Sequence, residues 1–382
     1  MWSVLKFNKM KNRVVSRNPF FLLALAGCLM VLAACNPAAA PGSDTPTVSA
    51  PDRQIVRVFC AGSLLIPVDA LEQAFEAANP DVDVQNECHG SIQVIRHVTE
   101  LHEPIDVVMT ADHALIPLLM YSTVDEDTGQ PYSRWYIRFA GNSMGLAYSA
   151  NSRYADEIDA QNWYEILSRP DVKIGLPDPR FDAAGYRMFM VTTLAQKYYG
   201  AAGLFDTLLK GDFTFPVTHF AEDGLTEITV PEVLETTASA GTVMRGSSIQ
   251  LLALLETGDI DYTFEYASVI AQHDLKSITL PDEINLGNPA YTEQYGAVQV
   301  KLDFQRFATV QPVFRGEPIG YGITIPTNAP NPDAAERYVD FLLSQAGREV
   351  MQSVSHPLLD PLICDQTENI PPGLQKYCDV TP

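Results

Sequence analysis

The sequence predicts an α/β protein in which a parallel sheet carries helices on both faces. Its 382 residues are enough for about two domains. Hydrophobic residues make up 46% and charged residues 19%, so the chain can bury a sizeable core. Between positions 54 and 117, stretches with strand and helix periodicity alternate, which is typical of parallel strands joined by crossover helices.

The first half is predicted from three short apolar stretches, each followed by a polar break. The stretches that predict strands are 54–59, 81–85 and 105–110. After the first two, a Gly-Ser pair precedes apolar residues at helical spacing, which predicts helices over 64–78 and 92–101.

The second half is predicted to contain helices over 163–167, 186–199 and 249–256. Gly258 is a plausible stop for the last of them. The stretches 146–148 and 322–325 predict isolated strands that cross between halves, and 334–344 predicts a helix that packs back on the first half.

The N-terminal segment is predicted to be an export signal. Five basic residues precede the apolar run 20–32, which has the length of a signal-peptide core. The ending Leu32-Ala33-Ala34-Cys35 resembles the lipobox of bacterial lipoproteins, which implies a lipidated Cys35. The alternative is an uncleaved anchor helix. Residues 36–53, rich in Pro, Ala, Ser and Thr, are predicted to be a flexible tether outside the cytoplasm, anchored by lipid to the outer face of the membrane.

The charge balance excludes some partners. The formal net charge is −22, which repels nucleic acid and anionic lipid, so we expect no nucleic-acid role and membrane association through the lipid alone. An anion must be held by local dipoles. No catalysis and no cofactor are expected, and the protein is expected to be a monomer.

Export makes disulfides possible. Four cysteines follow Cys35, and Cys60 and Cys88 each close a predicted strand in a similar local sequence. If those strands are parallel neighbours, the two sulfurs can meet. We predict Cys60–Cys88 and Cys364–Cys378, with free buried thiols as the alternative. No CxxC spacing or His pair supports a metal site.

Three loops share one pattern that suits an oxyanion. Gly62-Ser63, Gly90-Ser91 and Gly246-Ser247-Ser248 each precede a predicted helix. Glycine allows a ligand to approach the backbone, helix starts leave free N–H groups, and serine adds a donor. Taken singly, each serine is also a common helix N-cap. A fourth loop places Asp182 before a helix, either as its N-cap or as a carboxylate facing the ligand.

These loops, together with 182–187, 251–269 and the stretch 162–172, resemble the archaeal-type molybdate/tungstate-binding proteins, solute receptors of ABC importers. The resemblance covers about 56–352. It implies a two-lobed type II periplasmic-binding-protein fold, each lobe a mainly parallel sheet flanked by helices, with the ligand in the interlobe cleft. The first lobe would be 54–140 with 321–382, and the second 141–320.

The resemblance also implies the ligand contacts and a role as a carrier that delivers the oxyanion to a membrane permease. The residues that match the family's contact positions are Gly62, Ser63, Ser91, Asp182, Ala183, Ala184, Ser248 and Tyr266. Ser248 stands where the family has a Glu that reaches the metal of the oxyanion. Glu265 is not expected to replace that Glu, because it neighbours Tyr266 on a strand and should face the opposite way. Arg187 and Arg245 are expected to form surface ion pairs; the alternative is that they add positive potential behind the second-lobe donors.

Other interpretations stay open. Gly141-Asn142-Ser143-Met144-Gly145 matches the hydrolase pattern G-x-S-x-G, but a strand rather than a helix is predicted after it, so a serine hydrolase is not expected. Ser248 permits a receptor for sulfate or phosphate. A lipoprotein that senses a ligand without importing it is a further alternative.

Overall fold

The computed structural model describes residues 53–209, 212–237, 241–303 and 312–378. The predicted signal peptide, Cys35 and most of the tether lie outside the described residues. Among the described residues, no helix is long and apolar enough to cross a membrane.

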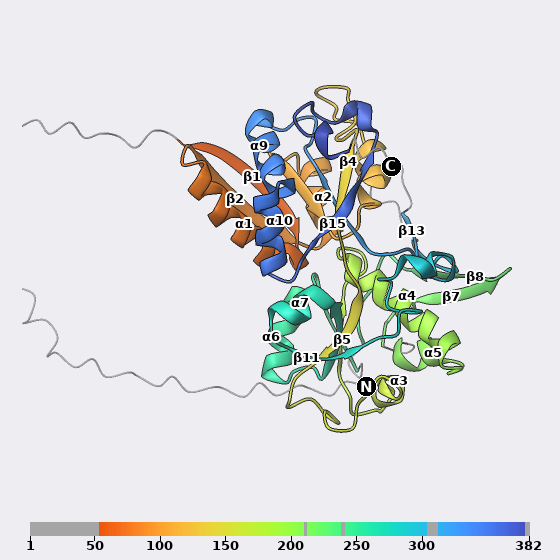
Figure 1. Cartoon of the computed structure of the whole chain (residues 1–382). Coiled ribbons are helices and arrows are strands. Elements are labelled where there is room, and N and C mark those ends of the chain that lie inside the picture. The colour runs from red at the N-terminus through yellow and green to blue at the C-terminus, as the bar shows by residue number, and fades with distance from the viewer. Residues whose placement is uncertain (1–52, 210–211, 238–240, 304–311, 379–382) are drawn as a thin grey trace, which may run out of the picture. The chain divides into compact units, whose positions relative to one another are not determined.

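A six-stranded sheet draws its strands from both ends of the described chain. Its order is β15-β4-β14-β3-β1-β2. The bounds are β1 Gln54–Ala61, β2 Val82–His89, β3 Val107–Thr110, β4 Tyr136–Gly141, β14 Gly320–Thr324 and β15 Leu358–Asp365. Figure 1 shows β4 and β15 side by side, although more than 200 positions separate them in the sequence.

Helices cover this sheet on both faces. Both Phe59 and Cys60, which point to opposite sides of β1, are buried. The helices and short turns of this part are η2 Gly62–Leu64, α1 Leu65–Ala78, α2 Ser91–Thr99, η3 Ile116–Tyr121, α9 Pro332–Leu343, α10 Gln345–Ser353, η5 Thr367–Asn369 and η6 Gln375–Tyr377. Helices α1, α9 and α10 pack together near β1 and β15, and α2 contacts β1 and β3.

A second sheet and a small third sheet lie between β4 and β14 in the sequence. The second has the order β11-β5-β10-β6-β9, and the third β13-β12-β8-β7. Their bounds are β5 Met144–Tyr148, β6 Ile174–Pro177, β7 Thr218–Glu222, β8 Leu225–Val230, β9 Thr242–Arg245, β10 Tyr262–Tyr266, β11 Lys276–Thr279, β12 Val298–Leu302 and β13 Val313–Arg315. The third sheet was not predicted.

Helices α4 and α6 lie on opposite faces of the second sheet. Leu146 and Ala147 are neighbours on β5, yet Leu146 packs in the main core and Ala147 packs with Leu251 and Leu255 of α6. The helices of this part are α3 Trp163–Leu167, α4 Ala183–Tyr198, α5 Leu204–Leu209, α6 Ile249–Thr257, α7 Ala267–Gln272, η4 Pro289–Tyr291 and α8 Thr292–Tyr295. Gly258 ends α6 with a φ of 77°, as predicted.

The α/β class is confirmed, but the sheets are mixed rather than mainly parallel. Strands β1, β2 and β3 pair in parallel, as do β6, β9 and β10. Strands β4, β14 and β15 pair antiparallel, as do β5 and β11 with their neighbours. Strands β4, β5 and β14 flank the segments on which the chain passes between the first sheet and the others, whereas β15 follows α10 and lies at the edge of the first sheet.

Both predicted disulfides are present. Cys60 and Cys88 are directly paired in the parallel register of β1 and β2, with a Cα–Cα distance of 4.4 Å. Cys364 at the end of β15 is bonded to Cys378, at 5.7 Å between Cα atoms. The alternative of free thiols is therefore wrong for all four.

Candidate functional site

Serines that follow neighbouring strands lie buried at the carboxyl edge of the first sheet. Ser63 follows β1 in η2, and Ser91 follows β2 as the first residue of α2. Their exposed fractions are 3% and 1%. Neither side chain caps its helix, and Ser248 does not cap α6 with its hydroxyl. The alternative interpretation of these serines as side-chain N-caps is wrong, so their hydroxyls serve other partners.

Asp182 joins the second-lobe loops. It caps α4, since its Oδ1 accepts a hydrogen bond from the Ala184 amide at 2.9 Å. Its Oδ2 accepts from the Ser248 amide at 2.9 Å, which ties the start of α4 to the start of α6. Asp182 is buried, and this burial raises the pKa of its carboxyl above the ordinary value. Ala183, also predicted as a contact, is buried in the first turn of α4.

Two glycines allow the first-lobe loops to touch the second-lobe loops. A Cβ on Gly62 would lie 2.8 Å from Ser247 Oγ, and a Cβ on Gly90 would collide with the carbonyl oxygen of Phe181. That same carbonyl accepts a hydrogen bond from the Ile92 amide at 3.0 Å, at the start of α2. The predicted contacts of one lobe therefore lie against those of the other, while their role in binding stays a prediction.

Glu265 faces away from Tyr266 as expected, yet it contacts Ser248, one of the predicted ligand residues. Glu265 and Tyr266 do face opposite sides of β10, but Glu265 lies on the side of α6 and its side chain extends along the strand to the carboxyl end. Its Oε1 accepts from the Tyr266 amide at 2.8 Å and from Ser248 Oγ at 3.3 Å. The strand alternation predicts the face of a side chain but not its reach along the strand.

Glu265 is a buried acid beside a second buried acid. Burial, reinforced by the charge of Asp182, raises the pKa of Glu265 to about 8. Its Oε1 already accepts two hydrogen bonds, whereas Oε2 is buried without a hydrogen-bond partner among the described residues. A proton on Oε2 therefore gives this end of the site one unused donor.

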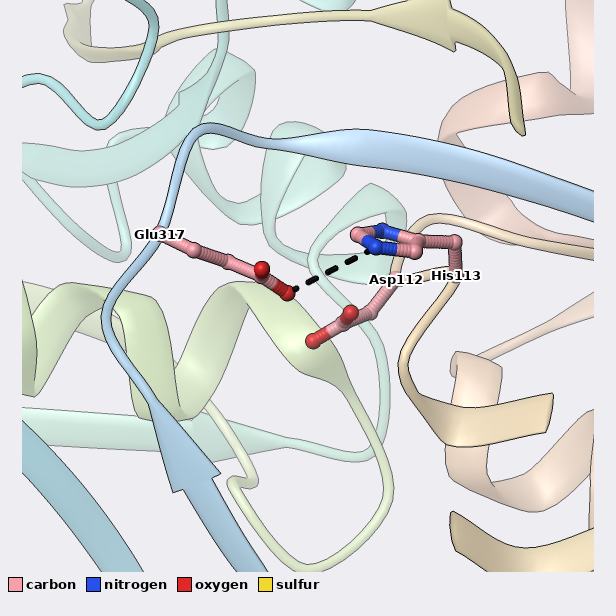
Figure 2. Close-up of side chains that lie close together, drawn as sticks. All are labelled: Asp112, His113 and Glu317. Carbon is pink, nitrogen blue, oxygen red and sulfur yellow. Dashed lines mark ion pairs between the residues drawn. The ribbon is translucent and has the colours of Figure 1, made fainter. Parts of the chain in front are cut away.

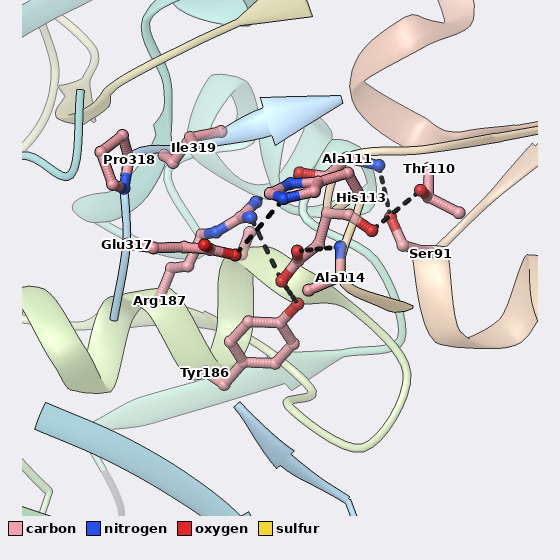
Figure 3. A network of polar contacts seen from close by, with 12 residues as sticks. Ser91, Thr110, Ala111, His113, Ala114, Tyr186, Arg187, Glu317, Pro318 and Ile319 are labelled. Carbon is pink, nitrogen blue, oxygen red and sulfur yellow. Dashed lines mark hydrogen bonds and ion pairs between the residues drawn. The ribbon is translucent and has the colours of Figure 1, made fainter. Parts of the chain in front are cut away.

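Arg187 donates a hydrogen bond to the Tyr266 hydroxyl and also contacts residues of the first lobe. Arg187 Nη1 donates to the Tyr266 hydroxyl and to the Ala111 carbonyl, both at 2.7 Å. Its Nη2 lies 3.3 Å from Asp112 Oδ2, which also accepts from the Tyr186 hydroxyl. Figure 3 shows Tyr186 and Arg187 within this network of polar contacts. Arg187 is 3% exposed, so the expectation of a surface ion pair is wrong for it.

Arg187 keeps its charge in this buried position. Burial opposes the charge, yet the Tyr266 oxygen and the Asp112 carboxylate together raise the pKa of Arg187 above the ordinary value. Arg245, by contrast, is exposed, and its Nη1 donates to the carbonyl of Met244. Among the described residues it forms no ion pair.

Among the described residues, the side chains of Asp112, His113 and Glu317 could together hold a metal ion. Their potential ligand atoms lie within 4.8 Å of one another, and His113 Nε2 is 3.8 Å from Glu317 Oε1 (Figure 2). Burial, together with the charge of Asp112, raises the pKa of Glu317 to about 7. The guanidiniums of Arg187 and Arg138 act on the same carboxylate, and their positive charges oppose a cation there.

The G-x-S-x-G pattern is a connection between strands. Gly141 ends β4, and β5 begins at Met144, so a strand rather than a helix follows Ser143. A hydrolase elbow needs a helix at that point. The pattern therefore carries no nucleophile, as the sequence indicated.

Sequence reasoning missed two residues that touch the predicted site. The Tyr321 hydroxyl lies 2.9 Å from Ser63 Oγ, and Asn142 Nδ2 donates to that hydroxyl at 3.0 Å. Tyr321 lies in β14 of the first sheet, and Asn142 lies in the turn that connects β4 with β5. The one available signal was a polar residue in a turn between strands, which does not indicate a partner 179 positions away.

Comparisons with known proteins identify the family of this chain. A family profile described as "Bacterial extracellular solute-binding protein" matches residues 56–353. An uncharacterized solute-binding protein of Methanococcus maripaludis is 35% identical over 96% of this chain and 97% of its own length. The molybdate/tungstate-binding protein WtpA of Thermococcus kodakarensis is 36% identical over 85% of this chain and 87% of its own length.

A solved structure of a binding protein shares the fold of this chain. The periplasmic molybdate-binding protein of Azotobacter vinelandii superposes with a TM-score of 0.52 at 16% identity, covering 80% of this chain and 99% of that one. At this identity the match concerns the fold alone. Periplasmic binding proteins of this kind are two-lobed, which confirms the predicted fold. The match to the solute-binding family agrees with the expectation that the chain is no enzyme. By its profile match and its relatives, the chain belongs to the bacterial extracellular solute-binding protein family.

Proposed function

We propose that the protein binds molybdate or tungstate between its lobes and delivers it to the permease of an ABC transporter. The observation that carries the proposal is that the first-lobe loop at Gly90 lies against the second-lobe loop at Phe181 and Asp182, where the amides of Ala184 and Ser248 donate to the Asp182 carboxylate. The molybdate/tungstate-binding protein of Thermococcus, which is 36% identical to this chain, supports this class of ligand.

The proposed contacts divide between the two lobes. Gly62, Ser63 and Ser91 supply amide and hydroxyl donors from the first lobe. Such donors suit an oxyanion in a molecule of net charge −22, because directed dipoles act at short range while the overall field repels anions.

The second lobe supplies a mixed surface. It comprises Asp182, the Ala183 amide and the Tyr266 hydroxyl, together with Ala184 and Ser248, whose amide and hydroxyl also donate to Asp182 and Glu265. Asp182 is the residue proposed to approach the central metal atom of the oxyanion, since its oxygens each accept one amide hydrogen bond and keep a lone pair. That arrangement favours a metal oxyanion, whose centre accepts an additional oxygen ligand.

Sulfate or phosphate is the second candidate ligand, and one residue favours it. Ser248 offers a hydroxyl where a carboxylate would reach a metal centre, which weakens the preference for larger metal oxyanions. Glu265 acts against this, because it places a second carboxyl 3.3 Å from Ser248 Oγ.

Anchoring and lobe boundaries complete the proposal. Residues 1–35 are proposed to be a lipoprotein signal peptide ending at a lipidated Cys35, and 36–53 a tether on the outer face of the membrane. The first lobe is proposed to comprise 54–140 with 321–382, and the second 141–320. The protein would act as a monomer without a cofactor.

Isothermal titration of the purified full-length protein in mild detergent tests the ligand. Molybdate, tungstate, sulfate and phosphate are compared, with Ser91→Ala and Asp182→Ala as site variants. Ser133→Ala is the matched control, because Ser133 is equally buried but bonds to Trp135 and Thr324 within the first lobe. Tight sulfate or phosphate binding with weak molybdate and tungstate binding would overturn the ligand assignment, and equal losses in Ser91→Ala and Ser133→Ala would overturn the site.

A further inference from the structure

Two hydroxyls of the proposed site each receive a hydrogen bond from a group that can only donate. Ser91 Oγ accepts from the Ala111 amide at 2.9 Å, and the Tyr266 hydroxyl accepts from Arg187 Nη1 at 2.7 Å. Amides and guanidiniums have no acceptor to offer in return. The protons of both hydroxyls are therefore free to point at a ligand.

Ser63 is different, because its partner is another hydroxyl. Ser63 Oγ and the Tyr321 hydroxyl are 2.9 Å apart and both buried, so the distance alone does not say which one donates. If Ser63 donates to Tyr321, its proton is lost to a ligand. If Tyr321 donates to Ser63, the Ser63 proton is available, as it is for Ser91.

Asn142 decides between these two states. Its Oδ1 accepts from the Ser143 amide at 3.0 Å and from the Ser268 amide at 3.3 Å, which fixes the orientation of the side-chain amide. Its Nδ2 therefore donates, to Ser268 Oγ at 2.8 Å and to the Tyr321 hydroxyl at 3.0 Å. Burial raises the pKa of Tyr321, so the phenol keeps its proton. Tyr321 therefore donates a hydrogen bond to Ser63 Oγ.

We propose that Asn142 is a positioning residue that, through Tyr321, orients the Ser63 proton toward the bound oxyanion. This inference rests on the proposed function of the site. It makes all three hydroxyls donors in the same sense. Such a set suits an oxyanion, because each of these hydroxyls can donate its proton to a ligand oxygen.

The variant Asn142→Asp should reverse the direction of the hydrogen bonds from residue 142 to Tyr321 and from Tyr321 to Ser63, with little change in side-chain shape. A carboxylate at this position accepts from Tyr321, and Tyr321 in turn accepts the proton of Ser63. The ligand then loses one charge-assisted hydrogen bond, and we expect roughly 10- to 100-fold weaker binding of molybdate or tungstate. Tyr321→Phe removes the hydroxyl that bonds to Ser63, so the Ser63 proton is neither held nor oriented. We expect the affinity for the oxyanion to fall only about two- to fivefold.

The double variant Asn142→Asp/Tyr321→Phe separates orientation from charge. Without the phenol, the carboxylate cannot draw on the Ser63 proton, and we expect the affinity to recover to that of Tyr321→Phe. If the double variant binds as weakly as Asn142→Asp, the loss comes from charge repulsion and the inference is overturned.

A second measurement serves if Asn142→Asp does not fold. In the Ser63→Ala background, Tyr321→Phe should leave the remaining affinity unaltered, because no Ser63 hydroxyl is left for Tyr321 to orient. An equal loss of affinity in both backgrounds would refute the inference. Titration of the unsubstituted full-length protein comes first. Absence of binding by all four oxyanions would overturn the proposed function and this inference together, whereas wild-type binding with an unweakened Asn142→Asp variant would overturn the inference alone.

Discussion

Replacing Glu265 by Gln should make the protein more stable at alkaline pH and leave it nearly unaltered at pH 5. Glu265 is fully buried, its Oε1 accepts from Ser248 and Tyr266, and the carboxyl of Asp182 lies nearby. An amide keeps the accepting oxygen, resembles the protonated acid in shape and cannot ionise. The variant therefore removes one titration and little else.

The magnitude follows from the pKa of Glu265 in the folded and unfolded chain. Burial raises it from the ordinary 4.5 to about 8 in the folded protein. The folded state thus holds the proton more tightly, so this contribution to stability is complete below pH 4.5 and is lost as the pH rises to 8. At about 1.4 kcal/mol per pKa unit, the full loss is ~5 kcal/mol, and relaxation around the charge reduces it to an expected 2–5 kcal/mol.

Urea unfolding of the ligand-free protein between pH 5 and 8.5 measures this effect. The difference in unfolding free energy between Glu265→Gln and wild type should grow with pH. Glu317, whose pKa is raised to about 7, titrates in both proteins and cancels in that difference. Glu157→Gln is the control, because its exposed carboxylate should produce no growing difference. A pH-independent difference for Glu265→Gln would refute the account of Glu265 as a buried acid.

Three further predictions concern the lobe contact, the ligand preference and the disulfides. Arg187→Ala leaves the buried carboxylate of Asp112 without its ion-pair partner, and we expect about 3–5 kcal/mol lower unfolding free energy by urea titration; a loss below about 1 kcal/mol would contradict the buried bridge. Ser248→Glu should shift the ratio of calorimetric affinities toward molybdate and tungstate over sulfate, and an unaltered ratio would count against our account of that position. Peptide mapping without reduction should recover Cys60 joined to Cys88, together with the C-terminal pair, and free thiols at these positions would exclude both bonds.

Much of the fold could be predicted because it depends on local patterns. The helix over 163–167 and the start of the helix at Ile249 agree with α3 and α6. Strand ends were less accurate, since β2 runs to His89 instead of ending near 85. Its later residues are polar or half-buried, so hydrophobic periodicity stops before the strand does.

The sequence by itself determined the α/β class, the alternating strands and helices of the first half and the family, because each depends on local periodicity or on motifs in the chain. The tertiary structure alone decided the reach of Glu265, the burial of Arg187 and the link from Asn142 through Tyr321 to Ser63. Those contacts join residues from 17 to 258 positions apart. They depend on how packed elements meet at the edges of the sheets, and a pattern of apolar and polar residues specifies which face is buried but not which distant side chains share an edge.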